Sequence, residues 1–473
     1  MKKISIIVLM LVLVLSVGLV SAGPNDLPGT GWTSGQQIQN VGGSSGTVNL
    51  TAYDTSGNDY NCGDQALDPG ESYTYLPDND CATMPAGFEG SAVASADQPI
   101  AAIVNVANLS VGKAAGQYTG TDGSAVATSL VFPLVKSNHA GRTTTFYVQN
   151  ASNSMNTISA AYVVNNVTYN DSFPNVPPNA MVILNPADAG VPTGTGNVGA
   201  LTVTGTQAIA GSSLEHETTA SIAANLQASR GFVPSDFSDS LSCPLARYQF
   251  GGLNTTTGLQ VMNVSGGTET IEVTYNVIFP APHTVGPIVA SNVPNGASAN
   301  FLQSDDLAPG ELASISVTSA GGGDLVAIVN DRADNPNPKR FTTYACFNEA
   351  NATSTISLPL VKEGFFNNTT GVQVQNVGNA PTTVTLVYRT HTGSTVTISH
   401  TDPIQPDASK TFFRLPANGT SNITVVSGNI NDLNSTVNGV TVTASQPIVA
   451  IANEANYNGV NPQDTKNYEG FNQ

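Results

Sequence analysis

The sequence predicts an all-β protein made of four tandem, antiparallel β-sandwich domains of about 110 residues each. Two observations lead to this fold class. Short segments in which apolar and polar residues alternate are separated by turns rich in Gly, Pro, Asn and Ser, and no stretch of ten or more residues has the spacing of an amphipathic helix. The same blocks recur four times along the 473 residues. One domain type therefore accounts for nearly the whole chain.

The amino terminus has the features of a secretion signal. Lys2 and Lys3 precede an apolar run over residues 4–20, and small residues surround a cleavage point after Ala22. The run is long enough to serve as an uncleaved anchor, but the small residues and Pro24 favour cleavage. No second long apolar segment follows, so we expect no transmembrane span after signal removal.

The first two blocks of each repeat predict a β-hairpin. The first strand ends in Asn in every copy, with spacings of 110, 113 and 113 residues: Asn40, Asn150, Asn263 and Asn376. The second strand ends in Tyr 12 or 13 residues later: Tyr53, Tyr162, Tyr275 and Tyr388. Gly, Asn and Ser between the two strands suit a tight turn.

The next two blocks are a turn and a late strand. The turn carries Pro, with Gly, Asn or Asp where a positive φ is needed, at residues 67–70, 176–179, 293–296 and 404–407. The late strand is almost continuously apolar at residues 98–105, 324–330 and 446–453, and only a weak version remains at residues 207–211. Such apolarity predicts a strand that is buried on both faces.

Each copy after the first opens on a Pro-Leu strand, at residues 132–135, 243–246 and 358–361. Proline suits the start of an edge strand or the entrance to a domain. The resulting domains are a signal peptide and four β-sandwich repeats: residues 1–22, 23–128, 129–240, 241–355 and 356–473. A four-bladed β-propeller is the main alternative, but its blades of about 40–50 residues are shorter than this repeat.

The segments between the repeats predict the overall shape. Residues 109–130 and 227–242 are rich in Gly, Ser and Thr, as linkers or long crossing loops are. We therefore expect small interfaces between domains and an elongated molecule.

Composition excludes some partners. Charged residues make up 10% of the chain and the formal charge is −18, or −20 once Lys2 and Lys3 are removed with the signal. Nucleic acid and anionic membrane surfaces are therefore poor partners. We expect other cell-surface or matrix components as partners, together with self-association.

Four cysteines in an exported chain predict two disulfides. Cys62 and Cys81 lie within the first repeat, and Cys243 and Cys346 bracket the third. We expect the pairs Cys62–Cys81 and Cys243–Cys346. Free thiols or a metal site are the alternative, but the sequence has no CxxC pair and no Cys/His cluster.

A search for catalytic or metal-binding motifs gives few candidates. The five histidines show no metal-binding spacing, although His391 and His400 could face each other across a hairpin around Gly393. The pair Asp305-Asp306 does not recur with aromatic neighbours. We predict no catalytic residue, no resident metal and no cofactor.

One loop resembles part of a calcium-binding loop. Residues 54–59 alternate oxygen-bearing side chains around Gly57, but no terminal bidentate Glu follows. Calcium is thus the only cofactor candidate. The alternative is that the loop is a plain hairpin turn without a bound ion. Trp32, the single tryptophan, is expected to fill a core.

Asn-x-Ser/Thr sequons are abundant and mark candidate N-glycosylation sites. They begin at Asn49, Asn108, Asn150, Asn166, Asn170, Asn254, Asn263, Asn351, Asn367, Asn368, Asn418, Asn422 and Asn434. A chain rich in Asn, Ser and Thr generates many sequons by chance.

The order of the blocks resembles that of uncharacterised secreted or cell-surface proteins of bacteria and archaea with tandem immunoglobulin-like repeats. The resemblance implies four Ig-like antiparallel β-sandwich domains and an extracellular, cell-surface location, and it carries over no active residue. We expect a structural or adhesive protein, such as a stalk, surface-layer or filament subunit. A carbohydrate- or ligand-binding module array is the alternative, and a secreted hydrolase is a weaker one.

Overall fold

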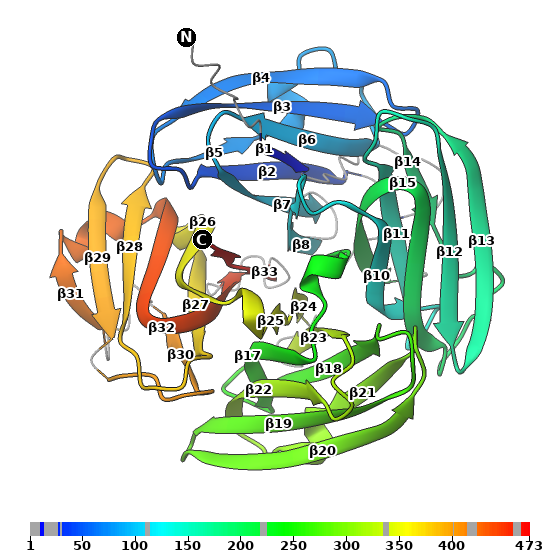
Figure 1. Cartoon of the computed structure of the whole chain (residues 1–473). Helices are drawn as coiled ribbons and strands as arrows, with labels where there is room; N and C mark the ends of the chain where they lie inside the picture. Colours follow the sequence, from blue (N-terminus) through cyan, green and yellow to red (C-terminus); the bar gives the residue numbers. More distant parts are fainter. Residues whose placement is uncertain are drawn as a thin grey trace, which may run out of the picture.

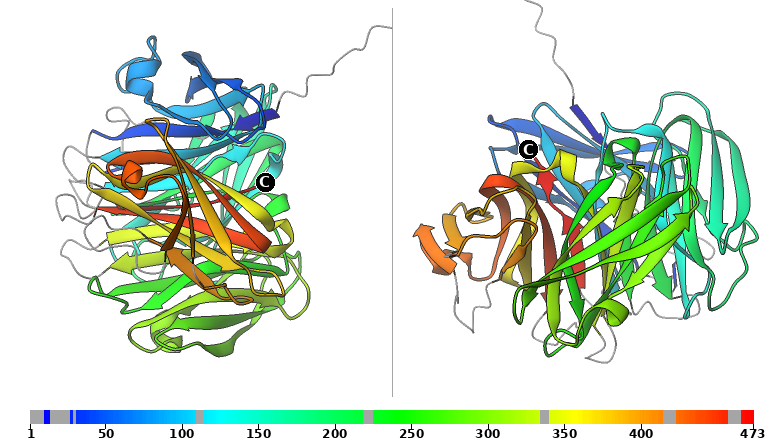
Figure 2. Two further views of the ribbon diagram at one scale, coloured as in Figure 1. Left: turned by 90° about the vertical axis from the view of Figure 1, so that its left-hand side faces the viewer. Right: turned by 60° about the horizontal axis from the view of Figure 1, so that its bottom comes forward.

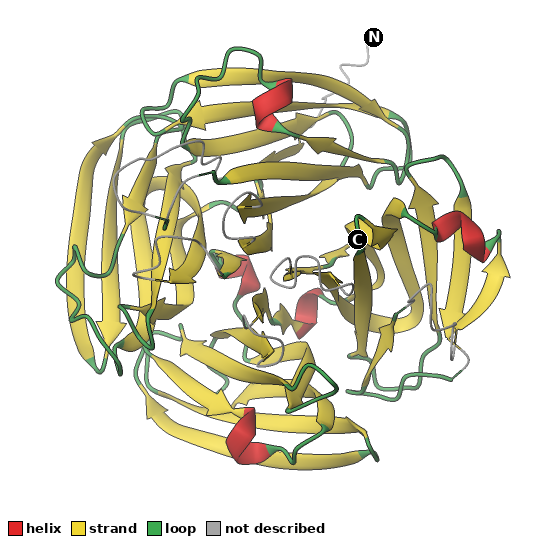
Figure 3. Cartoon of the chain, turned by 180° about the vertical axis from the view of Figure 1, so that it is seen from behind, coloured by secondary structure: helices red, strands yellow, loops and turns green. Residues whose placement is uncertain are grey.

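Four two-sheet units surround a common axis in the computed structural model of the chain (Figure 1). The structure describes residues 10–13, 27–28, 31–108, 114–217, 225–333, 340–400, 402–413, 423–456 and 465–473. Strands dominate every unit, and the helices are single short turns (Figure 3). The chain is therefore all-β and sandwich-like, as the sequence predicted.

Units 1 and 3 each contain two separate sheets. Unit 1 has the strand orders β4-β3-β6-β1-β9 and β5-β2-β7-β8, and unit 3 has β20-β19-β22-β17-β25 and β21-β18-β23-β24. The elements of unit 1 are β1 (Met10–Leu13), β2 (Thr33–Asn40), β3 (Gly46–Asp54), β4 (Asp59–Leu67), β5 (Ser72–Tyr75), α1 (Pro77–Asp80), β6 (Gly90–Ala96), β7 (Ile100–Asn108), β8 (Ala114–Thr119) and β9 (Thr121–Asp122). The elements of unit 3 are β17 (Ser240–Tyr248), β18 (Thr255–Asn263), β19 (Glu269–Phe279), β20 (His283–Val293), β21 (Ser298–Leu302), α2 (Gln303–Asp306), β22 (Glu311–Ser319), β23 (Leu325–Ala333), β24 (Arg340–Ala345), β25 (Phe347–Asn348) and η2 (Glu349–Asn351).

In units 2 and 4 one long strand belongs to both sheets and joins them. The elements of unit 2 are β10 (Ala127–Lys136), β11 (Arg142–Asn150), β12 (Asn156–Val164), β13 (Val167–Val176), β14 (Met181–Leu184), the long β15 (Val198–Glu217), β16 (Leu226–Arg230) and η1 (Pro234–Asp236). The elements of unit 4 are β26 (Thr353–Phe365), β27 (Asn368–Asn376), β28 (Val384–Thr390), β29 (Thr395–His400), β30 (Ser409–Phe412), β31 (Ile423–Ser427), η3 (Ile430–Leu433), the long β32 (Thr436–Asn456), β33 (Thr465–Glu469) and β34 (Phe471–Asn472). The second repeat was expected to lack a clear late strand. That expectation was wrong, because the late strand is the second half of β15.

The recurring asparagine joins the hairpin to the following turn. In unit 4, Asn376 Nδ2 donates to the carbonyl oxygens of Ala380 and Ile404 at 2.8 and 2.9 Å, and its Oδ1 accepts from Gly378 N at 2.9 Å. Equivalent bonds are made by Asn40, Asn150 and Asn263. The repeated residue is therefore a structural staple that satisfies buried backbone carbonyls.

The predicted turn has the expected backbone geometry in all four copies. The residues with positive φ are Gly70, Asn179, Gly296 and Asp407, with φ values of 78°, 60°, 78° and 61°. These residue types tolerate the left-handed region at low cost.

The Pro-Leu segments are bulges inside strands and not the starts of edge strands. The pairing register shifts between Phe132 and Val135 in β10, and the same shift occurs in β17 and β26. A tyrosine of the innermost strand fixes this bulge in two units: Tyr468 OH accepts from Leu360 N and donates to Leu360 O. Tyr344 does the same with Leu245. Proline is tolerated because a bulge leaves its position without a ladder hydrogen bond.

The predicted elongated arrangement is wrong, because the four units close into a ring. The innermost strands β8, β16, β24 and β33 contact one another in turn, and β33 returns to β8 (Figure 1). Side views show one compact body and no extended row (Figure 2). The predicted linkers at residues 109–130 and 227–242 instead contain β8, β9 and parts of β10, β16 and β17.

The apolar cores are continuous between units. The unit 1 core includes Leu214 and Leu226 of unit 2, the unit 3 core includes Val449 and Ile451 of unit 4, and the unit 4 core includes Ile103 of unit 1. Large shared apolar contacts of this kind hold the units in fixed positions. Among the described residues, no helix is both long enough and apolar enough to cross a membrane.

Candidate functional site

A polar trio recurs beside the axis in units 2, 3 and 4. It consists of a base three residues after the Pro of the Pro-Leu bulge, a Thr six residues before the staple Asn, and an acid on the late strand. The trios are Lys136/Thr144/Glu215, Arg247/Thr257/Asp331 and Lys362/Thr370/Glu454. Each Thr hydroxyl accepts from the backbone N–H of the base, at 2.9–3.2 Å.

The charged members of the trio form ion pairs. Lys136 and Lys362 each lie 2.8 Å from their acids, Glu215 and Glu454, and Arg247 contacts Asp331. Unit 1 has no such acid, because Val106 takes its place opposite Ser34. The trio is thus a feature of three units, and sequence comparison of the copies at these offsets could have found it.

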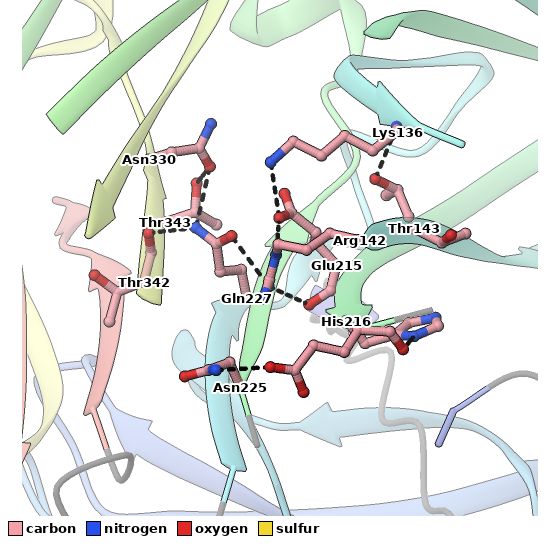
Figure 4. Close-up of polar contacts among 12 residues, drawn as sticks. Lys136, Arg142, Thr143, Glu215, His216, Asn225, Gln227, Asn330, Thr342 and Thr343 are labelled. Atoms are coloured by element: carbon pink, nitrogen blue, oxygen red, sulfur yellow. Dashed lines mark hydrogen bonds and ion pairs between the residues drawn. The ribbon is translucent and has the colours of Figure 1, made fainter. Parts of the chain in front are cut away.

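The unit 2 trio is the centre of a larger network (Figure 4). Glu215 also contacts Arg142, and Arg142 Nη2 donates to Glu215 O and Gln227 Oε1 at 3.2 and 3.4 Å. Burial alone would raise the pKa of Glu215, but Lys136 and Arg142 outweigh it and lower the pKa to about 2. Glu215 is therefore an anion at all ordinary pH values.

This network crosses from unit 2 to unit 3. Gln227 Nε2 donates to Thr342 O at 2.7 Å and to Asn330 Oδ1 at 3.3 Å. The Arg142 guanidinium lies over the Phe341 ring, 4.4 Å from its centroid. Around the axis near Gln117 and Gln227 there is no room for a water molecule. The network thus joins unit 2 to unit 3 through hydrogen bonds and side-chain packing.

A pocket of about 310 Å³ lies between units 3 and 4. Its described lining includes Arg247 and Asp331 of unit 3, together with Phe341, Gln373 and Glu454. A wider depression of about 600 Å³ lies among the short strands β9, β25 and β34, where the Arg230–Asp236 ion pair occupies its polar wall.

The histidines lie apart from one another. His391 lies at the turn of the β28–β29 hairpin and accepts from Val437 N at 3.2 Å, whereas His400 ends β29 and packs on Phe412. Because β29 has about 3.3 Å of rise per residue, the strand separates the two rings. The expectation that they could face each other was wrong. Among the described residues, no group of three or more His, Cys, Asp or Glu lies close enough to hold a metal ion.

The other candidate acids have local structural roles. Burial works to raise the pKa of Asp54, but hydrogen bonds from Asn58, Ser56 and Tyr60 outweigh it and lower the pKa. Both Asp54 oxygens thus accept from their own turn, which is how a hairpin turn is stabilised. Asp306 accepts from the buried Tyr275 hydroxyl at 3.0 Å.

The structure contains both expected disulfides, Cys62–Cys81 and Cys243–Cys346. Trp32 is 4% exposed and belongs to the unit 1 core. The recurring tyrosines Tyr162, Tyr275 and Tyr388 are buried, whereas Tyr53 is partly exposed.

The candidate glycosylation sites differ in accessibility. The exposed ones are Asn166, Asn170, Asn351, Asn367 and Asn434, and Asn49 and Asn254 are partly exposed. The buried ones are Asn108, Asn150, Asn263 and Asn368. Asn418 and Asn422, like most of the predicted signal peptide, lie outside the described residues. Asn150 and Asn263 are staple residues, so their amides are already engaged in the folded chain.

The chain matches no known protein-family model and no curated protein. The resemblance to Ig-like repeat proteins stays a hypothesis.

Proposed function

We propose that this chain is an exported, non-catalytic cell-surface protein whose closed ring is a rigid platform for adhesion. The observation that carries the proposal is the use of the recurring charged residues. In units 2, 3 and 4 they pair with one another beside the axis. Because these repeated charged groups are already paired within their own units, recognition is left to loops and outer strands.

Export is supported by the amino-terminal sequence and by the two disulfides. Disulfides persist in oxidising compartments and are rare in the cytosol. No cysteine among the described residues is free, and each disulfide links two segments of one unit. The exposed sequons of units 2, 3 and 4 suit a surface that a glycosylating host would modify.

The edge strands favour adhesion over filament growth. A filament would add strands at the outermost edges of the sheets. The long edge strands β13 and β20 carry Pro174 and Pro287, which cannot donate to a new ladder. In β31, by contrast, Val425 and Val426 are 40% and 60% exposed and no proline interrupts the strand. Edge-to-edge assembly should therefore favour β31 over β13 and β20.

A cell-binding assay with electron microscopy tests the proposal. The purified mature chain, labelled and monomeric, should bind cells or extracellular matrix and should show separate ring-shaped particles. The variant Val426→Lys should bind equally well. Filaments that disappear in Val426→Lys would replace adhesion with a filament role, and substrate turnover would overturn the non-catalytic role.

A further inference from the structure

We propose that the pocket between units 3 and 4 binds a neutral carbohydrate of one or two sugar residues. This goes beyond the adhesive role and rests on the pocket alone. Its volume of about 310 Å³ is at the lower end of ordinary ligand pockets.

The pocket exists because two bulky residues that fill the interface between units 2 and 3 have small counterparts between units 3 and 4. Between units 2 and 3, Arg142 covers the Phe341 ring and fills the space. The equivalent residues between units 3 and 4 are Thr255 and Thr465. Thr255 lies eight residues before its staple Asn, as Arg142 does. Thr465 occupies the place of Phe341 on the inner strand. Both threonines line the pocket. The site thus marks a difference between this interface and the one between units 2 and 3.

The charges of the lining favour a neutral ligand. Four described charged residues line the pocket, the bases Arg247 and Arg340 and the acids Asp331 and Glu454, so that their formal charges sum to zero. Arg247 is paired with Asp331, and Glu454 lies 2.8 and 2.9 Å from Lys362 and Lys466. The lining itself therefore carries no net formal charge.

Hydrogen-bonding capacity is nevertheless left over in the lining. Asp331 Oδ1 and Asn453 Oδ1 are buried acceptors without a partner, and Arg247 Nε is a buried donor without one. A buried polar atom in this state costs about 1–3 kcal/mol. These atoms are almost fully buried, so a ligand reaches them only when their side chains turn toward the pocket. A sugar hydroxyl both donates and accepts and so matches this mixture of two acceptors and one donor, whereas an ammonium group only donates and a carboxylate only accepts.

The lining also has an apolar part. The rings of Phe250, Phe341 and Phe413 belong to it, beside the Cβ-less Gly371. Aromatic walls with a few placed polar groups are the usual composition of a small-molecule site. Rings of this kind suit the C–H face of a sugar, while the polar wall suits its hydroxyl edge.

Calorimetric titration of the full-length mature chain tests this inference. The probes are glucose, galactose, mannose, N-acetylglucosamine, maltose and cellobiose, with glutamate, lysine and inorganic phosphate as charged comparisons. At least one neutral sugar should bind with 1:1 stoichiometry. If only a charged probe binds, or none binds, the carbohydrate assignment is overturned.

Two variants locate the binding. Thr255→Arg with Thr465→Phe recreates the plug of the unit 2–unit 3 interface and should abolish sugar binding, and Asp331→Asn should weaken it by about tenfold to a hundredfold. Gly371→Leu places a side chain in the lining and should also weaken sugar binding. Gly258→Leu is its matched control and should leave binding unchanged, because Gly258 holds the same place in unit 3 but is outside the pocket lining. Thermal unfolding confirms that each variant folds. Sugar binding that survives the plug in a folded variant would overturn the site, whereas the cell-binding assay judges the adhesive role separately.

Discussion

Thr119 and Glu469 lie 350 residues apart in the sequence, yet the Thr119 hydroxyl donates to Glu469 Oε2 across 3.1 Å inside the ring. Thr119 ends β8 of unit 1, and Glu469 ends β33 of unit 4. The other Glu469 oxygen accepts from Ala345 N of unit 3. One carboxyl group therefore joins three units at the point where the ring closes.

The folded chain should tolerate a neutral side chain at Glu469 but should lose stability when the side chain is removed. Burial raises the pKa of Glu469, although the hydrogen bonds and Arg230 oppose this. A raised pKa means that ionisation works against the folded state as the pH rises above about 4.5. Glu469→Gln should match or exceed the wild-type free energy of unfolding at pH 7, whereas Glu469→Ala should lose about 1–3 kcal/mol because Ala345 N loses its acceptor. Urea unfolding at pH 7 measures both, and equal losses would contradict the role.

Glu215 should give the opposite pH dependence. Its pKa in the folded chain is about 2, against 4.5 for the free group. A lowered pKa stabilises the folded state above pH 4.5, and this contribution is lost as the pH falls from 4.5 to about 2. The difference corresponds to about 3 kcal/mol. Glu215→Gln should remove this part of the acid destabilisation and should destabilise the chain at pH 7, because Lys136 and Arg142 lose their anion.

Unfolding free energies from pH 2 to pH 7 measure this effect. The exposed Asp432→Asn serves as the control and should leave the pH profile unchanged. A Glu215→Gln profile parallel to that of the wild type would show that the network does not contribute.

The two disulfides should differ in their stabilising effect. Cys243 and Cys346 are 103 residues apart, and Cys62 and Cys81 are 19 apart. Since a longer closed loop restricts the unfolded chain more, replacing the longer-range pair with Ser should cost roughly 1–2 kcal/mol more than replacing the shorter one. Denaturant midpoints of the two double variants give the ranking, and the reverse order would count against the loop-entropy explanation.

The staple asparagine should contribute to the stability of the folded chain. Asn376→Ala leaves the carbonyls of Ala380 and Ile404 without this donor and should cost about 1–3 kcal/mol. The exposed Asn434→Ala should change stability by less than about 0.5 kcal/mol. Thermal unfolding compares them, and an Asn376→Ala variant as stable as Asn434→Ala would refute the staple.

Export should remove a strand from unit 1. β1 lies within the predicted signal peptide and pairs with β6 and β9, in the place that β10, β17 and β26 take in the other units. We expect the exported chain to begin at Gly23, so that β6 loses this neighbour and its backbone amides exchange faster than those of β22. Intact mass and hydrogen exchange measure the two effects. An exported chain that still contains Met10 would show that the segment is retained as a strand.

Much of each unit could be predicted from the sequence, because its determinants are local. Alternating residues predict the strands, and Gly70, Asn179, Gly296 and Asp407 take the positive φ that their turn requires. The staple Asn was visible as a repeat, although its bonds were not. Both disulfides followed from the positions of four cysteines.

The ring was decided only by the tertiary structure. A segment such as residues 114–119 has no long apolar run, and it becomes a buried strand because two equivalent strands, β16 and β33, pack beside it in the ring. The candidate pocket depends on this closure too. Ring closure brings Thr255 and Thr465 together between units 3 and 4, at the positions that Arg142 and Phe341 occupy between units 2 and 3. Local sequence encodes the units. Their arrangement depends on contacts between residues hundreds of positions apart, which no periodicity in the sequence records.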